Sequence, residues 1–236
     1  FESWLGGWAM SYSRSIAPSA VPDTEMLSSM MAGIGMNVAT TPDWNANIED
    51  TLYFASIEGM EHYDLRTLSL VTQWLSVHLR RVNADRIIRV ISACPFERVR
   101  SYWKAVAVWQ SKDRRLVRLL DTYRGSRIDL LPSGTDFQIS RCGEDTRFVN
   151  GPLRVPAGTL RERESDILSP QELASRHPAY RWRILVGPTY RADMLAHLEN
   201  NPGLSASELA RLAYGSFATA HEVKRDWSVL SMTQSV

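Results

Sequence analysis

The sequence predicts a mainly α protein with a small β element, and three observations support this fold class. In residues 64–82, apolar side chains recur at intervals of three and four, which is the spacing of one buried helical face. In residues 128–158, glycine and proline recur between short runs, 137–140 and 146–149, that fit an antiparallel β element. Hydrophobic residues make up 44% and charged residues 22%, which is typical of a folded domain and excludes disorder, collagen and coiled-coil arrays.

The elements of the first half follow in order along the chain. We expect helices over residues 23–36, from residue 48 onward, and over 64–82, 85–93 and 96–124, the last in two pieces separated by a charged break. Asp64 precedes the first apolar contact of its helix and is expected to cap it, and Pro95 ends the helix before it. We expect one helical domain over residues 1–125, a β-containing connector over 126–178 and a further domain over 179–236.

Residues 190–230 carry the most specific pattern. A helix over 191–200 ends at an Asn-Asn-Pro-Gly sequence, and Ser205 with Glu208 forms a capping box that begins a second helix. Gly215 is expected to take a positive φ in the short turn that follows. A third helix places Ala220, Val223 and Trp227 on one face. Helix, tight turn and helix, with a polar outward face on the second, is the helix-turn-helix arrangement.

These residues resemble the trihelical core of bacterial winged-helix transcriptional regulators, including repressors of the toxin-antitoxin type. The resemblance covers 40 of the 236 residues, 191–230. It implies a winged-helix-like trihelical domain whose third helix lies in the major groove of double-stranded DNA.

The resemblance also assigns site residues in this sequence. It implies that Ser216, Thr219, His221 and Arg225 face the groove, whereas Lys224, Arg211 and Ser205 reach phosphate. Two departures from the family stand out. Residues 231–236 are too few for a β-hairpin wing, and the carboxylate of Glu222 on the presumed reading face would repel phosphate.

Two functions follow, and the sequence leaves both open. The favoured hypothesis is a DNA-binding transcriptional regulator that binds its site as a homodimer through the apolar stripes of the helical domain. The alternative is a non-enzymatic interaction module, such as a defence or toxin-antitoxin component, whose trihelical core binds a partner protein.

The charge is distributed unevenly along the chain. Residues 1–74 carry two basic and nine acidic side chains, residues 75–127 carry thirteen basic and four acidic, and the remainder twelve and thirteen. The basic segment either continues a DNA footprint or pairs with the acidic first third. We favour pairing for Arg80, Arg81, Arg98, Arg100, Arg114, Arg115 and Arg118.

We expect no enzymatic activity and no cofactor or metal. Gly125-Ser126 and Asp129 suggest nucleotidyl transfer, but the second and third carboxylates that two metals require are missing. The histidines are scattered, and Cys94 and Cys142 form no metal-binding pair. Residues 26–40 are too short and too polar for a membrane span, and the start at Phe1 has no basic region before an apolar core. A cytoplasmic location without a secretion signal is therefore expected.

Overall fold

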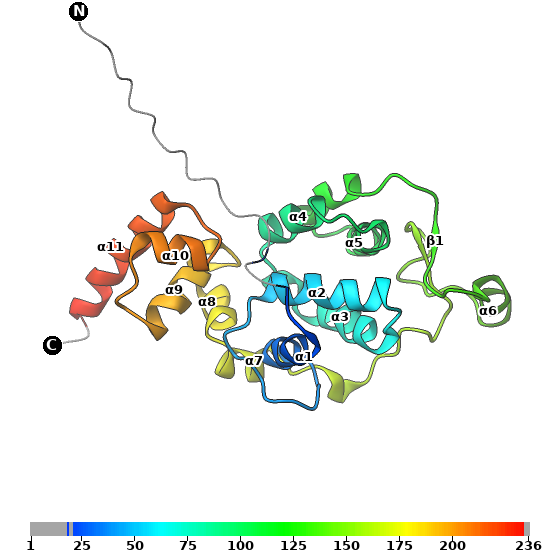
Figure 1. Ribbon diagram of the computed structural model, residues 1–236, viewed down its shortest axis with the longest axis horizontal. Helices are drawn as coiled ribbons and strands as arrows, with labels where there is room; N and C mark the ends of the chain where they lie inside the picture. Colours follow the sequence, from blue (N-terminus) through cyan, green and yellow to red (C-terminus); the bar gives the residue numbers. More distant parts are fainter. Residues whose placement is uncertain (1–17, 19–20, 234–236) are drawn as a thin grey trace, which may run out of the picture.

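The computed structural model describes residues 18 and 21–233, and the start of the chain, for which no secretion signal is expected, lies outside them. The described chain is mainly helical, as the sequence predicts (Figure 1). In the first part the elements are α1 (Thr24–Gly33), α2 (Ile48–Glu61), α3 (Leu65–His78), η1 (Leu79–Arg81), α4 (Ala84–Ser92), α5 (Glu97–Trp109) and η2 (Arg114–Asp121). They continue with β1 (Ile128–Asp129), α6 (Thr135–Cys142), β2 (Leu153–Arg154), η3 (Glu164–Asp166), α7 (Pro170–Arg176), α8 (Pro178–Val186), α9 (Tyr190–Asn200), α10 (Ala206–Leu212) and α11 (Phe217–Thr233).

Side-chain caps begin several of these helices where the sequence indicates them. The Asp64 carboxylate accepts hydrogen bonds from the backbone N–H groups of Arg66 and Thr67, so the predicted cap of α3 is confirmed. Ser169 and Glu172 form a capping box at α7, where Pro170 occupies the first helical position. The break predicted within residues 96–124 is also confirmed, and its second piece is the 3-10 helix η2.

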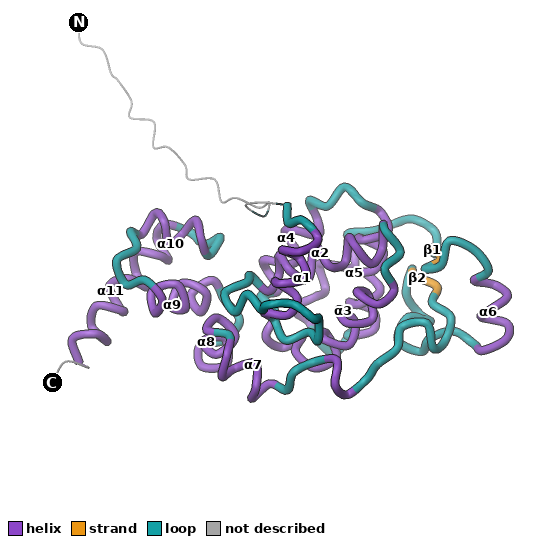
Figure 2. Tube along the Cα trace, turned by 60° about the horizontal axis from the view of Figure 1, so that its bottom comes forward, coloured by secondary structure: helices purple, strands orange, loops and turns teal. Residues whose placement is uncertain are grey.

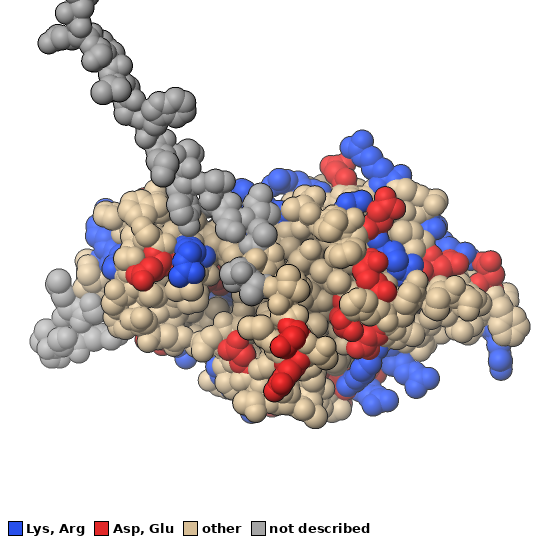
Figure 3. Space-filling view, in the orientation of Figure 1, with Lys and Arg blue, Asp and Glu red and all other residues tan. Residues whose placement is uncertain are grey.

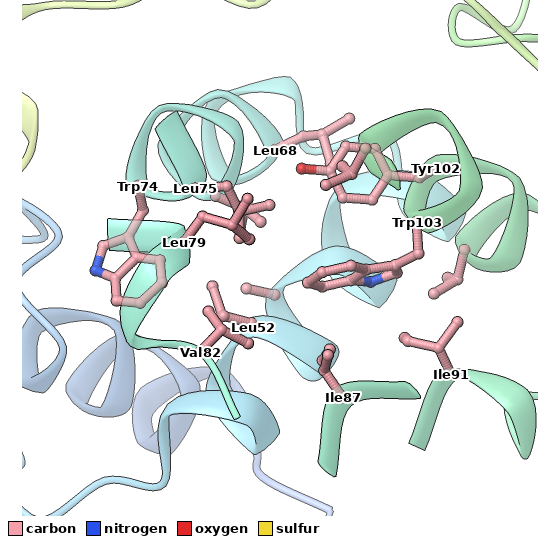
Figure 4. Packing of buried hydrophobic residues seen from close by; sticks show 14 of the residues in the cluster. Leu52, Leu68, Trp74, Leu75, Leu79, Val82, Ile87, Ile91, Tyr102 and Trp103 are labelled. Carbon is pink, nitrogen blue, oxygen red and sulfur yellow. The ribbon is translucent and has the colours of Figure 1, made fainter. Parts of the chain in front are cut away.

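The larger core lies between α2, α3, α4 and α5. The apolar stripe of α3 faces inward, and Leu52, Trp74 and Trp103 are completely buried there (Figure 4). Each indole N–H has a partner, because Trp74 donates to the Ile34 carbonyl at 2.7 Å and Trp103 donates to the Ser56 hydroxyl at 3.0 Å. The stripe that the sequence assigns to dimerisation is therefore used within the chain.

The β element differs from the prediction. Residues 137–140 belong to α6, residues 146–149 form turns, and the two short strands β1 and β2 pair in parallel, with Ile128 opposite Leu153. The antiparallel expectation is wrong because a run of four residues cannot distinguish a strand period from a helix period. Parallel strands need a crossover connection, which the segment containing α6 supplies.

A second, smaller core holds α9, α10 and α11 together. Its buried members are Met194, Leu195, Leu198, Leu209, Ala210, Ala213, Ala220 and Val223. Residues from the 126–178 segment, such as Leu130 and Phe148, pack instead into the larger core. Two views place α11 at one end of the elongated molecule and α6 at the other (Figures 1 and 2).

Candidate nucleic-acid interface

The capping box that the sequence predicts at the start of α10 is confirmed. The Ser205 hydroxyl accepts from the Glu208 N–H at 3.2 Å, and the Glu208 carboxylate accepts from the Ser205 N–H at 2.8 Å. Hydrogen bonds from the side chain and the backbone N–H of Ser205 hold the pKa of the Glu208 carboxyl below its usual range. Ser205 is exposed, but an anionic side chain already occupies the helix end where a phosphate was expected.

The turn between α10 and α11 has a different backbone conformation from the one expected. Tyr214, not Gly215, takes the positive φ, at 53°. The Tyr214 hydroxyl is anchored by donating to the Asp50 carboxylate at 2.6 Å. Gly215 allows a close approach, because a Cβ there would lie 2.2 Å from Cε of Met194 on α9 and the end of that side chain would have to move. The glycine therefore lets the turn pack against α9, which no local pattern indicates.

Ser216 and Thr219 lie at the beginning of α11. The Ser216 Oγ accepts from the Thr219 N–H at 3.0 Å, and the two hydroxyl oxygens lie 2.7 Å apart. Both residues are half-buried. Their hydrogen-bonding groups therefore already stabilise the helix start.

Of the remaining predicted residues, three are exposed and one is hydrogen-bonded within the protein. Arg211, His221 and Arg225 are exposed, and the Arg225 side chain keeps 71% of its surface accessible. The Lys224 ammonium is half-buried and donates to the Leu204 carbonyl, so it also fixes α11 to the loop before α10. Three of the seven predicted residues thus project from the trihelical unit with their charge or ring accessible.

Acidic side chains lie among these exposed groups. Arg191 of α9 pairs with Asp226 at 2.8 Å and with Glu222 at 3.7 Å, both on α11. The Arg191 guanidinium holds the pKa of Asp226 below its usual range. Figure 3 shows basic and acidic side chains beside one another over this end of the molecule. The face is therefore polar and of mixed charge.

The seven arginines expected to pair with the acidic first third do not do so, although Arg86 of the same basic segment pairs with Asp50. None of the seven arginines forms an ion pair with a described acidic residue of that third. Arg98 and Arg115 instead donate to backbone carbonyls, for example those of Met60 and Val82, where the chain leaves its helices. Arg114 and Arg118 are exposed. These arginines therefore stabilise chain reversals or lie in solvent.

A buried ionic network, which no pattern in the sequence predicts, joins α8 to α2 and α9. The Arg183 guanidinium donates to both oxygens of Glu49, to both oxygens of Asp193 and to the Arg81 carbonyl, at 2.6–3.0 Å. All three ionic side chains are buried. The signal available in the sequence was a single arginine within the apolar run of residues 182–186. Glu49 lies 134 positions away and Asp193 ten positions away, and neither carries a pattern of its own.

A second buried pair lies beside this network. Arg86 of α4 donates to Asp50 of α2 at 2.5 Å, and its guanidinium lies over the Tyr214 ring, 3.6 Å from the ring centroid. Because Tyr214 also bonds Asp50, this cluster fixes the α10–α11 turn to the larger body. Burial raises the pKa of Asp50 above its usual range despite the neighbouring arginine.

Neither a family model nor a curated protein nor a solved structure matches this chain. Within the described residues, no cluster of three or more His, Cys, Asp or Glu side chains is arranged to hold a metal ion. None of the described helices has the length and hydrophobicity of a membrane span. The resemblance to winged-helix regulators stays a prediction.

Proposed function

We propose that this chain is a DNA-binding protein that acts in transcription control, with α11 as the helix that enters the major groove. The observation that carries the proposal is the position of α11. It buries Ala220 and Val223 against α9 and α10, and it projects His221 and Arg225 outward at the end of the molecule. An arginine on such a helix suits bidentate contact with guanine.

The cap of α11 and the turn before it support the same function, because they hold α11 in a fixed orientation. Ser216 and Thr219 hold the first turn of α11, Lys224 ties it to the loop before α10, and Tyr214 ties the turn to α2. A reading helix must be held in one orientation, because base contacts depend on precise placement of a few side chains.

The proposal is tested by selection from a randomised DNA duplex library, followed by fluorescence anisotropy at fixed salt on the enriched sequence. Arg225→Ala should weaken binding by about 1–3 kcal/mol and relax specificity at one position. Arg141→Ala is the matched control, because Arg141 is an exposed arginine of α6 at the other end of the molecule. Failure to enrich any sequence, or equal loss in both variants, would contradict the proposal.

We further propose that the chain binds DNA as a homodimer, since one trihelical unit contacts few base pairs and symmetric dimers read two half-sites. The α3 stripe is buried in the monomer, so the contact must use another surface. Light scattering in solution should then give twice the chain mass of 26.7 kDa. Protein concentrations of tens of micromolar are on the order of the dissociation constant of a weak dimer. A measured mass of one chain at these concentrations would overturn the expectation.

A second candidate function is the binding of a partner protein by the trihelical unit. Phe217 and Val229 of α11 expose 47% and 60% of their surfaces, and such apolar side chains beside mixed charges are typical of protein interfaces. The library selection separates the two functions, because a protein-binding module enriches no duplex sequence.

A further inference from the structure

A cleft of about 220 Å³ opens between the two cores. One side comes from residues 22–54, which include parts of α1 and α2, and the other from residues 179–214, which include parts of α8, α9 and α10. Clefts at such junctions are common sites for small molecules. A molecule held here would contact the larger body and the trihelical unit at once.

Acidic groups dominate the charge of this cleft. The lining contains the carboxylates of Asp43, Asp50 and Asp193 but a single guanidinium, that of Arg183. That guanidinium is shared with the buried Glu49, which takes two of its hydrogen bonds. Burial raises the pKa of Asp193 above its usual range, as it does for Asp50. Arg183 also donates to both oxygens of Asp193, and Arg86 from outside the lining donates to Asp50. The buried Glu49, Asp50 and Asp193 thus face two guanidinium groups, and a cationic group placed here would offset the one negative charge in excess.

The cleft lining also has an apolar part. Met26, Met30 and Phe54 line it, and Met26 leaves 52% of its surface exposed. Methionine side chains adapt to ligands of different shape. At the rim, the Asn200 amide donates to the Asn45 side-chain oxygen at 2.7 Å and links α9 to the loop before α2.

We propose that this cleft binds a small organic cation, an amine with a short apolar arm. The ammonium group lies near Asp50 and Asp193, and the arm packs against Met26, Met30 and Phe54. The volume is below the range of about 300–1,000 Å³ typical of drug-sized ligands, so the ligand is correspondingly small. An anion would be repelled by the three carboxylates, and a neutral apolar molecule would leave their charge unchanged.

Benzylamine is a suitable probe, with benzyl alcohol and benzoate as neutral and anionic partners of the same shape. Titrations followed by amide NMR should show saturable shifts of residues around the cleft with benzylamine, and at least tenfold weaker binding of the other two. Equal binding of benzyl alcohol, or no saturable shift at about 20 mM amine, a concentration well above a millimolar dissociation constant, would overturn the proposal.

Two variants locate the site. Ala179 is a half-buried lining residue of α8, so Ala179→Leu should fill the cleft and weaken benzylamine binding at least tenfold. Ala174→Leu on α7 is the control, because Ala174 is also half-buried but lies outside the lining. Asp50→Asn, which removes charge at nearly constant volume, should weaken the amine more than benzyl alcohol. Unchanged amine affinity in both cleft variants would contradict the assignment, whatever the outcome for DNA.

Discussion

Arg183 is the residue on which the junction of the two cores depends most. Its five N–H groups all have acceptors, four on the carboxylates of Glu49 and Asp193 and one on the Arg81 carbonyl. A buried guanidinium is tolerated only when its donors are satisfied in this way. The partners come from α2 and α9, so one side chain of α8 connects the larger body to the trihelical unit.

Arg183→Met should destabilise the protein by about 3–5 kcal/mol, because Glu49 and Asp193 would remain buried without a counter-charge. The free energy of unfolding in urea measures this effect. Arg181→Met is the matched control, since Arg181 is on the same helix and also pairs with a carboxylate, Glu199, but both are about 40% exposed. That exposed pair should contribute about 0–1 kcal/mol. Similar losses in the two variants would show that the buried network is not specially stabilising.

At the scale of one element, α8 begins with an unusual cap. The His177 Nδ1 accepts from the Tyr180 N–H at 3.1 Å, and Nε2 donates to the Ala46 carbonyl at 3.0 Å. The neutral ring with its proton on Nε2 satisfies both contacts, whereas a proton on Nδ1 would remove the acceptor for the helix start. Burial lowers the pKa of His177 from 6.5 to about 4.

This cap predicts a pH dependence of stability. As pH falls through 6.5 the unfolded chain takes up a proton at residue 177 before the folded chain does, so stability is lost between pH 6.5 and about 4. His177→Asn keeps a capping side chain without a titrating ring. The urea unfolding free energy of this variant should therefore fall less steeply than that of the wild type over this pH range.

His221→Asn serves as the control for this experiment, because His221 is exposed on α11. Its pH profile should follow the wild type. Burial lowers the pKa of His78 to about 4 as well, so the His177 variant should keep part of the acid sensitivity. Parallel profiles for the His177 variant and the wild type would contradict the assigned role of His177.

At the scale of the whole molecule, the proposed DNA contact is small. Of the basic side chains near α11, Arg191 is engaged with Asp226 at 2.8 Å and Lys224 with the Leu204 carbonyl. Arg211 is exposed for phosphate contact, and Arg225 lies 3.7 Å from Asp226 but keeps 71% of its side chain accessible for a base. The exposed arginines of η2 and its end, Arg114, Arg118 and Arg124, belong to the larger body.

The salt dependence of DNA binding distinguishes these two groups. One phosphate contact per chain, that of Arg211, predicts that log K falls with log salt with a slope of about −0.9 per chain. Replacing Arg114, Arg118 and Arg124 by alanine should leave this slope unchanged in the full chain, whereas Arg211→Ala should reduce it by about 0.9. A wild-type slope steeper than about −4 per chain, reduced by the triple replacement, would show that the larger body also contacts DNA.

Local patterns were sufficient for most helices and for the caps at Asp64 and Ser205, because these features depend on residues within one or two turns of each other. The same patterns identified Ala220 and Val223 as the buried face of α11. They could not identify which exposed cations are already engaged. Arg191 and Lys224 find partners on other elements, and that pairing depends on how the elements pack.

By itself, the sequence determined the helical class of this protein, the extent of most helices and the helix-turn-helix order of its last part. Tertiary structure alone decided that β1 and β2 pair in parallel, that Gly215 serves a close approach to Met194, and that Arg183 joins Glu49 to Asp193. The physical reason is the separation along the chain over which each interaction acts. Hydrophobic period and capping act between near neighbours, whereas burying a charge requires partners from distant segments, here 134 positions apart for Arg183 and Glu49.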